Sequence, residues 1–371
     1  MSFRVRIAAI ALFLFWFTGR LLAQQPVSWH DPSPHNIEFV TVDDNVKLEV
    51  LDWGGSGRPL VLLAGFGDTA HVFDDFAAKL TSTNHVYGIT RRGFGASSHP
   101  DSGYSADRLG DDVLAVFDAL KLERPILVGH SFAGEELSSV GTRYPQRIAG
   151  LIYLEAAYDE AYYSPSLGDY DIDLPELKKK LEQLQAAKEP KVKHQLIEEL
   201  LQTDLPLFER DLDELRKMTP ELPSPPRSTA EDRKNIDAWQ SRQKRNDGVA
   251  MPESELRQQY EVSNTGVVGS KKPTVDDQLF LAGFQKYTDI RVPVLAIFAS
   301  PHDWGPFLEN NPTAHEAMKP GESAMAARVE AFETGVPSAH VVRLPNANHH
   351  VFLSNEADVL REMRAFIATL R

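Results

Sequence analysis

The sequence predicts an α/β fold, with a mostly parallel central sheet, helices on both faces of the sheet and an inserted helical segment. Short apolar runs of strand length alternate with stretches of helical periodicity from residue 59 onward. This alternation is typical of parallel sheets that are covered by helices. The rhythm stops over residues 156–289 and resumes at residue 292. A strand, turn and helix near the middle of the chain carry the most information about function.

The first elements follow from alternation and from apolar runs. Residues 36–42 and 46–53 alternate in polarity on either side of a turn, which predicts an antiparallel hairpin. Residues 59–64 are apolar and predict a buried strand, and residues 85–90 are the next predicted strand. Residues 105–120 carry apolar side chains on one face at helical spacing, so an amphipathic helix leads toward the centre of the chain.

The second half of the chain repeats this pattern after the insertion. Residues 148–154 predict one buried strand before the insertion, and residues 292–299 and 340–344 predict two more after it. Residues 356–370 have the periodicity of a final helix. These elements extend the same sheet, because strands joined through helices run parallel to one another.

The inserted stretch, residues 156–289, is predicted to be a helical cap. Apolar residues recur at helical spacing at Leu177, Leu181 and Leu184. The sequence Ser-Thr-Ala-Glu at residues 228–231 matches a capping box, which predicts that a further helix opens there. A disordered insert is the alternative, and the amphipathic leucines disfavour it.

The first 23 residues are set apart from this fold. Residues 1–6 include two arginines, and residues 7–17 are almost entirely apolar. This pattern is typical of a secretory signal peptide, here with cleavage near Ala23. An uncleaved membrane anchor is the alternative, and Arg20 disfavours it because it interrupts a run that is already short for a spanning helix. We therefore expect a secreted or periplasmic protein, without stable membrane insertion once the signal is removed.

The bulk composition restricts the class of partner. The 371 residues carry a formal net charge of −14. An acidic chain disfavours nucleic acid as a partner, because phosphate backbones attract basic surfaces. The chain has no cysteine, so an exported form has no disulfides and its core must hold the fold alone. A small molecule remains the expected partner.

The most informative stretch is residues 125–134, which read PILVGHSFAG. The run Ile-Leu-Val predicts a buried strand, and helical periodicity begins at Glu135. Strand, tight turn and helix form the context of a nucleophile elbow, in which Ser131 stands exposed at the sheet edge between small residues. The backbone N–H of Phe132 then lies at a helix start and points to where an oxyanion would form.

These residues resemble the α/β-hydrolase superfamily, in its serine-nucleophile branch with a helical cap. The usual G-x-S-x-G elbow reads Gly-His-Ser-Phe-Ala at residues 129–133, with alanine in the last place. The sequence Ala-Gly-Phe-Gly at residues 64–67 is similar to the family's His-Gly-x loop, which implies that the N–H of Phe66 is the second oxyanion donor. The resemblance implies a core domain over residues 24–155 and 290–371.

The resemblance also implies a catalytic triad. A serine hydroxyl needs a base, and the base needs an orienting acid. The family order of serine, acid and histidine implies Ser131, Asp303 and His349. Glu155, at the end of the strand after the elbow helix, is the alternative acid, and His350 is the alternative base. All of these residues follow predicted strands, at the edge where parallel sheets place their sites.

We therefore expect an exported serine hydrolase that acts on a small-molecule ester through an acyl-enzyme. The same triad could instead hydrolyse carbon–carbon bonds or carry out perhydrolysis, and a slow small-molecule binding or sensor protein is a further alternative. We expect no cofactor and no metal, because the histidines and the aspartate near residues 302–303 and 349–350 are already used by the triad.

Overall fold

The computed structural model describes residues 29–218 and 221–370, so the expected signal peptide lies outside the described residues. Its centre is an eight-stranded sheet with the strand order β1-β2-β4-β3-β5-β6-β9-β11. The strands β1–β2 and β2–β4 pair antiparallel, and every other neighbouring pair in this sheet is parallel. The strands are β1 (Asn36–Asp43), β2 (Val46–Gly55), β3 (Arg58–Leu63), β4 (Asn84–Ile89), β5 (Ile126–His130), β6 (Gly150–Leu154), β9 (Val294–Ala299) and β11 (Ala339–Leu344).

Successive residues of the central strands enter two different cores, one on each face of the sheet. In β3, Val61 and Leu63 join one core, and Leu60 and Leu62 join the other. This alternation follows from the pleat, which points neighbouring side chains to opposite faces. Fully apolar strands are therefore expected wherever helices cover both faces.

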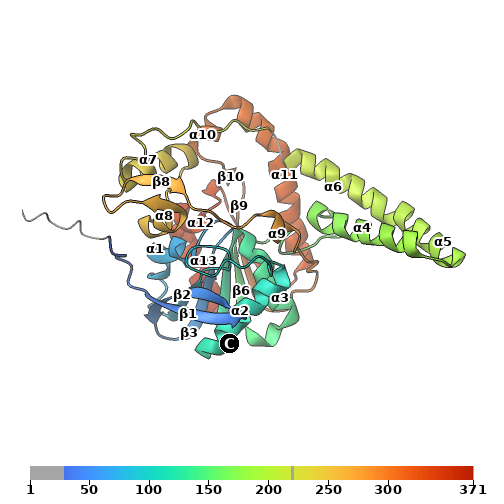
Figure 1. The fold of residues 1–371 in the computed structure, drawn as a ribbon, viewed down its shortest axis with the longest axis horizontal. Coiled ribbons are helices and arrows are strands. Elements are labelled where there is room, and N and C mark those ends of the chain that lie inside the picture. Colours follow the sequence, from blue (N-terminus) through green and yellow to red (C-terminus); the bar gives the residue numbers. More distant parts are fainter. Residues whose placement is uncertain (1–28, 219–220, 371) are drawn as a thin grey trace, which may run out of the picture.

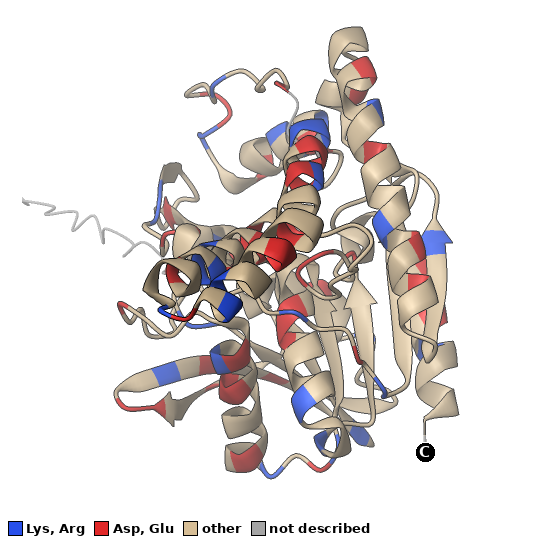
Figure 2. Ribbon diagram, turned by 90° about the vertical axis from the view of Figure 1, so that its right-hand side faces the viewer, with Lys and Arg blue, Asp and Glu red and all other residues tan. Residues whose placement is uncertain are grey.

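Helices cover both faces of the sheet, as the sequence predicts (Figure 1). The core that contains Val61 also contains residues of α2 (Ala106–Leu120), α3 (Gly134–Arg143) and α11 (Pro312–Gly335). The opposite core contains residues of α1 (Asp74–Ala77), α12 (Val351–Ser354) and α13 (Glu356–Thr369). Figure 2 shows Lys, Arg, Asp and Glu mainly on helices, loops and the edge strands, whereas the central strands of the sheet are largely free of them.

The chain between β6 and β9 is mainly helical and also contains a short hairpin that the sequence pattern missed. Strands β7 and β8 pair antiparallel as a separate two-stranded sheet. They are only three and four residues long, too short for a clear alternation. The boundaries of a separate cap domain stay a prediction. The elements are α4 (Tyr170–Ala186), α5 (Pro190–Glu199), α6 (Leu205–Met218), α7 (Ile236–Asp247), α8 (Glu253–Gln259), β7 (Tyr260–Val262), β8 (Val268–Lys271) and α9 (Gln278–Leu281).

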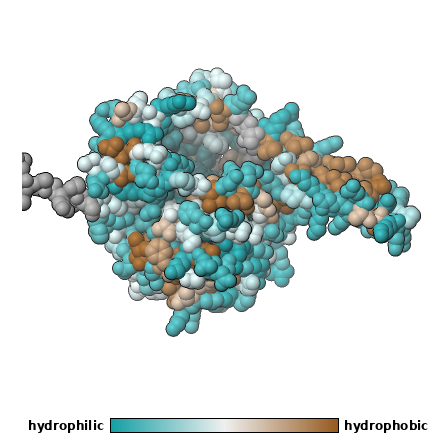
Figure 3. All heavy atoms as spheres, viewed as in Figure 1, coloured by the Kyte–Doolittle hydropathy of each residue, from teal (hydrophilic) through white to brown (hydrophobic). Residues whose placement is uncertain are grey.

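The helices α4, α5 and α6 form an arm that projects from the body of the molecule, whereas α7 and α8 lie against the body (Figure 1). Figure 3 shows apolar side chains gathered along this arm. Within residues 29–218 and 221–370, none of the helices has the length and apolar character needed to span a bilayer. The exposed large apolar residues of the arm include Leu181, Val192, Ile197, Leu201, Leu205, Leu212 and Leu215.

The helix predicted to open at residues 228–231 begins later. Thr229 Oγ1 instead accepts a hydrogen bond from the backbone N–H of Asp232 at 3.1 Å, within a turn. The helix α7 starts at Ile236, and the Asn235 side chain caps it by accepting from the N–H of Ala238 at 2.8 Å. A serine or threonine with an acid three residues on stabilises a turn as well as a helix start, so the pattern alone misplaced the boundary.

Candidate active site

Ser131 directly follows β5 and opens a single 3₁₀ turn, Ser131–Ala133, that runs into α3. Its φ angle is +52°, in the left-handed region that side chains other than glycine rarely adopt. The turn is also crowded. A Cβ atom on Gly129 would lie 2.6 Å from Leu137 Cδ1, and one on Gly134 would lie 1.8 Å from the carbonyl oxygen of Ala156. The elbow therefore depends on glycine at both positions.

His349 lies within hydrogen-bond distance of the serine. Its Nε2 is 2.9 Å from Ser131 Oγ. It follows β12 (Ala347–Asn348), a short strand that pairs in parallel with β10 (His302–Asp303). The His349 side chain is 42% exposed, so solvent reaches the imidazole. This geometry allows a proton to pass from the hydroxyl to the ring.

The carboxylate on the other side of this ring belongs to Glu155, which was the alternative acid. Its Oε2 lies 3.6 Å from Nδ1 of His349, and its side chain is fully buried. Tyr158 Oη donates to both carboxylate oxygens, at 3.0 and 3.1 Å, and the backbone N–H of Ala299 donates to Oε1. Glu155 follows β6 with a φ of +51°, so both it and Ser131 have strained backbones at the ends of neighbouring strands.

Asp303, the acid expected first, lies elsewhere, and this corrects the sequence prediction. Its Oδ1 accepts a hydrogen bond from the N–H of Gly305 at 2.9 Å. The neighbouring residue His302 is the one that faces Glu155, with 3.8 Å between Nδ1 and Oε2. Consecutive residues of a strand point to opposite sides, so β10 directs His302 toward Glu155 and Asp303 away from it.

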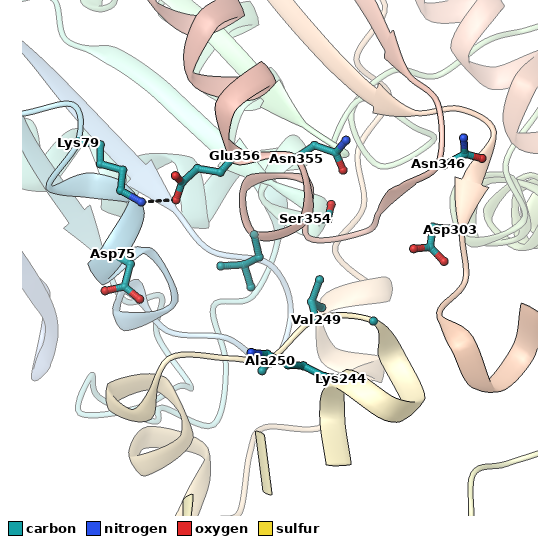
Figure 4. A pocket seen from close by; sticks show the side chains of 12 residues that line it. Asp75, Lys79, Lys244, Val249, Ala250, Asp303, Asn346, Ser354, Asn355 and Glu356 are labelled. Carbon is teal, nitrogen blue, oxygen red and sulfur yellow. Dashed lines mark hydrogen bonds and ion pairs between the residues drawn. The ribbon is translucent and has the colours of Figure 1, made fainter. Parts of the chain in front are cut away.

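Asp303 lines a surface pocket of about 700 Å³, and neither Ser131 nor His349 lines that pocket. Figure 4 shows Asp303 near Asn346, across the pocket from the ion pair of Lys79 and Glu356. The pocket lies between the C-terminal helices and the loop after α7. Its size alone therefore does not make it the substrate site.

The loop after β3 passes directly beside the nucleophile. A Cβ atom on Gly65 would lie 3.0 Å from Ser131 Cβ. Phe66 follows, and its ring contacts that of Phe132 with 5.7 Å between the centroids. Both rings also contact Phe280 of α9, at 5.3 and 5.5 Å. The two expected oxyanion donors, Phe66 and Phe132, thus lie on the two segments that flank the serine.

Arg91 is a residue that sequence reasoning missed. Its guanidinium binds the Glu136 carboxylate with two hydrogen bonds of 2.7 and 2.6 Å. It also donates to the carbonyl oxygen of Ala64 at 2.9 Å and lies over the ring of Phe132. One buried cation therefore connects the loop after β3 to the helix after the elbow, which fixes both oxyanion segments relative to each other. The neighbouring Arg92 makes a similar two-bond pair with Asp112, at 2.6 and 2.7 Å.

The fold and the arrangement around Ser131 agree with a comparison of the sequence with known families. The family model described as alpha/beta hydrolase family matches residues 60–362. The chain belongs to the α/β-hydrolase family. The resemblance of the elbow and of the loop after β3 to this superfamily is thereby confirmed at the level of the family and the fold.

Curated proteins match this α/β hydrolase over part of their length. AB hydrolase superfamily protein YisY of Bacillus subtilis (strain 168) is 34% identical over 125 residues, which are 32% of this chain and 45% of that protein. A non-heme chloroperoxidase of Streptomyces lividans is 32% identical over 122 residues, 32% of this chain and 44% of that protein. The chain spans less than half the length of these curated relatives.

A solved structure extends the likeness over the whole fold. The crystal structure of E-2-(acetamidomethylene)succinate hydrolase superposes on this α/β hydrolase with a TM-score of 0.54. The superposition covers 90% of this chain and 100% of that chain, at 17% sequence identity. At this identity the likeness establishes the shared fold.

A second histidine lies beside the base of this α/β hydrolase without facing the serine. His350 Nε2 is 3.1 Å from Asp68 Oδ2, and Gln259 donates to the other oxygen of Asp68 at 2.8 Å. His130 lies against both neighbouring rings, with centroid distances of 4.8 Å to His349 and 4.7 Å to His350. Burial, together with these two histidines, lowers the pKa of His130 well below its ordinary value. The neutral His130 ring donates from Nε2 to the carbonyl oxygen of His349 at 3.0 Å, which orients the base.

Proposed function

We propose that this α/β hydrolase is a serine hydrolase that cleaves a small-molecule ester through Ser131, His349 and Glu155. The observation that carries the proposal is the 2.9 Å contact between Ser131 Oγ and His349 Nε2, with the buried Glu155 carboxylate on the opposite side of the ring. A nucleophile, a base and an orienting acid in this order are the arrangement that activates a serine hydroxyl.

In the proposed reaction, Ser131 Oγ attacks the ester carbonyl carbon while His349 Nε2 takes the hydroxyl proton. The carbonyl oxygen becomes an oxyanion between the N–H groups of Phe66 and Phe132, each of which contributes about 2.7–4 kcal/mol to transition-state stabilisation. When the intermediate collapses, the C–O bond to the alcohol breaks, and His349 gives its proton to the departing oxygen. Water then loses a proton to His349 and attacks the acyl-enzyme, which releases the acid and restores the serine.

Aromatic side chains next to the oxyanion segments support an apolar substrate group. Phe66 is 37% exposed, and Phe132 and Phe284 are partly exposed. Their rings form a contiguous cluster around the buried Phe280. We propose that this cluster contacts the apolar part of the ester, since aromatic faces bury large areas with little loss of side-chain entropy.

Carbon–carbon bond hydrolysis or perhydrolysis by the same triad is the second candidate. Proteins that match part of this chain include a 2-hydroxymuconate semialdehyde hydrolase of Pseudomonas sp. (strain CF600) and the non-heme chloroperoxidase of Streptomyces lividans.

We also propose that residues 1–23 direct export. N-terminal sequencing of the protein from a secreting host would test this, and we expect the mature chain to start near Gln24.

The experiment is hydrolysis of p-nitrophenyl esters from acetate to palmitate, by the purified protein and its Ser131→Ala variant. We expect turnover that Ser131→Ala abolishes, together with fluorophosphonate labelling of Ser131 only. Labelling without ester turnover would favour the carbon–carbon or perhydrolase candidate, or a slow binding protein. Absence of labelling in folded protein would overturn the serine mechanism.

A further inference from the structure

A second group of ionisable side chains lies outside the triad, where the segment ahead of β1 meets the turn after β3. We call it the N-terminal cluster: Asp31 and His35 from that segment, His71 from the turn Ala70–Phe73 and Asp74 from α1. The side chains of His35 and His71 are 2% exposed, that of Asp74 is 4% exposed and that of Asp31 is 19% exposed. One potential ligand atom from each residue lies within 4.8 Å of the others. Two imidazoles and two carboxylates are thus gathered away from water.

The N-terminal cluster contains one contact of ordinary hydrogen-bond length, 2.8 Å between Nδ1 of His35 and Oδ1 of Asp74, whereas the contacts of His71 are longer. Nδ1 of His71 lies 3.4 Å from Oδ2 of Asp31 and 3.3 Å from Oδ2 of Asp74. Charge-assisted N–H···O⁻ bonds are about 2.7–2.9 Å long. Atoms bound to one tetrahedral zinc ion at about 2.0–2.1 Å are about 3.3 Å apart. The two distances at Nδ1 of His71 therefore match edges of a tetrahedral zinc site.

The groups behind the N-terminal cluster are arranged like the outer shell of a metal site. Nε2 of His71 is buried without a hydrogen-bond partner among the described residues, and Glu49 Oε1 lies 3.5 Å from it. The other oxygen of Asp74 accepts from Trp53 Nε1 at 3.1 Å and from Ser33 Oγ at 2.8 Å. Metal-binding histidines commonly direct their second nitrogen at a carboxylate, and metal-binding carboxylates are themselves hydrogen-bonded.

Carboxylates surround His71 in the N-terminal cluster. Asp31, Asp74 and Glu49 each place an oxygen 3.3–3.5 Å from one of its ring nitrogens. Three carboxylates around one imidazole leave excess negative charge in a buried place. A buried charge of this kind is costly unless it is paired or coordinates a metal.

We propose that the N-terminal cluster is a structural zinc site that ties the segment ahead of β1 to the hydrolase core. Two imidazoles and two carboxylates within 4.8 Å of one another suit Zn²⁺ better than Mg²⁺ or Ca²⁺, which prefer oxygen ligands at higher coordination number. Four protein ligands leave no open coordination position, which separates a structural zinc from a catalytic one. The site is independent of the triad, and the sequence did not predict it.

The test is metal binding by the whole purified chain, first stripped with a chelator and then titrated with ZnCl₂ against a chromophoric competitor. We expect one zinc per chain by elemental analysis and a rise of several degrees in the unfolding temperature. His71→Gln and Asp31→Asn should each weaken zinc binding at least about 100-fold, because each removes a ligand. Because Asp31 is partly exposed and asparagine has nearly the same shape, Asp31→Asn should fold normally. A loss of zinc binding in this variant would therefore not be due to misfolding.

Two further variants make the result specific. His85→Gln removes a histidine that pairs with Asp52 at 2.8 Å on the surface, and it should leave zinc binding unchanged. His350→Gln removes a member of the other possible metal-binding group, Asp68, His130 and His350, and it should also leave zinc binding unchanged. The proposal fails if the unmodified chain binds no zinc, or if zinc survives His71→Gln and Asp31→Asn and is lost in His350→Gln. Ester hydrolysis is not a readout here, so a failure of the proposed reaction does not affect this result.

Discussion

Oε2 of Glu155 lies 3.6 Å from Nδ1 of His349, on the side of the imidazole away from Ser131. A carboxylate at this position holds the ring in the tautomer that accepts the serine proton, and it stabilises the imidazolium that forms. Because Glu155 is itself held by Tyr158 and by the N–H of Ala299, it has little freedom to turn away from the ring. The Glu155 carboxylate is thus held at the ends of two neighbouring strands, β6 and β9.

The acid assignment gives the first prediction. Glu155→Gln should lower kcat on p-nitrophenyl butyrate by about 10³–10⁴-fold, because the amide cannot stabilise the imidazolium. Asp303→Asn is the matched control and should stay within about threefold of the parent, since Asp303 bonds the N–H of Gly305 instead of the ring. Steady-state kinetics of the two variants decide the matter, and the opposite ranking would restore Asp303 as the acid.

A second prediction concerns the crowded elbow. Gly134→Ala should destabilise the protein by about 2–4 kcal/mol, because the new Cβ would lie 1.8 Å from the carbonyl oxygen of Ala156 and the backbone must shift. Ala133→Gly, one residue earlier, restores the usual family elbow and should cost about 1 kcal/mol or less. Urea unfolding followed by circular dichroism measures both, and equal losses would show that crowding at Gly134 is not the cause.

A third prediction concerns Arg91. Arg91→Met should cost about 3–5 kcal/mol, because it leaves the buried Glu136 carboxylate without its cation. The double variant Arg91→Met with Glu136→Leu should recover most of this stability, since no charge is then left unpaired. Its kcat should stay low, because Arg91 also holds the carbonyl of Ala64 in the oxyanion loop. Full recovery of kcat in the double variant would show that Arg91 contributes to stability and not to the position of the oxyanion loop.

A fourth prediction is a pH dependence of stability that comes from Glu255 of α8. Burial, reinforced by Asp68, raises the pKa of Glu255 above its ordinary value of 4.5. The folded state therefore binds a proton that the unfolded state releases, so this group lowers stability as the pH rises above 4.5. Glu255→Gln keeps an acceptor for the N–H of Thr69, which Glu255 accepts at 3.0 Å. The variant should show a smaller decline in unfolding free energy between pH 5 and pH 9, and an unchanged slope would contradict the assignment.

The fold and the serine environment could be predicted because they follow from local patterns. Short apolar runs mark the five- and six-residue strands that are buried on both faces. The spacing of glycines around Ser131 marks the elbow, since the turn admits no larger residue at Gly129 or Gly134. His349 could be chosen over His350 from the residue before it, and the structure directs the ring of His349 at the serine.

The acid and the N-terminal cluster could not be predicted in the same way. Whether His302 or Asp303 faces the base depends on how β10 pairs with β12, and this register is set by contacts between distant segments. Asp31 and His71 are separated by 40 positions in sequence and meet only in the folded chain. A local signal was present in the spacing of Asp31 with His35 and of His71 with Asp74, but pairs of this kind are common on ordinary surfaces.

The arrangement of β6 and β9 has a consequence for when this enzyme becomes active during its synthesis. The two strands are neighbours in the sheet, yet residues 155–293 lie between them in the chain. The Glu155 carboxylate cannot accept the hydrogen bond from the N–H of Ala299 until that whole segment has been made and the two strands have paired. Closing such a long loop costs conformational entropy, which slows the pairing. His349 arrives later still. A chain synthesised only as far as the insertion contains Ser131 and Glu155 but not His349, so the proposed reaction requires the C-terminal strands to have been made and folded.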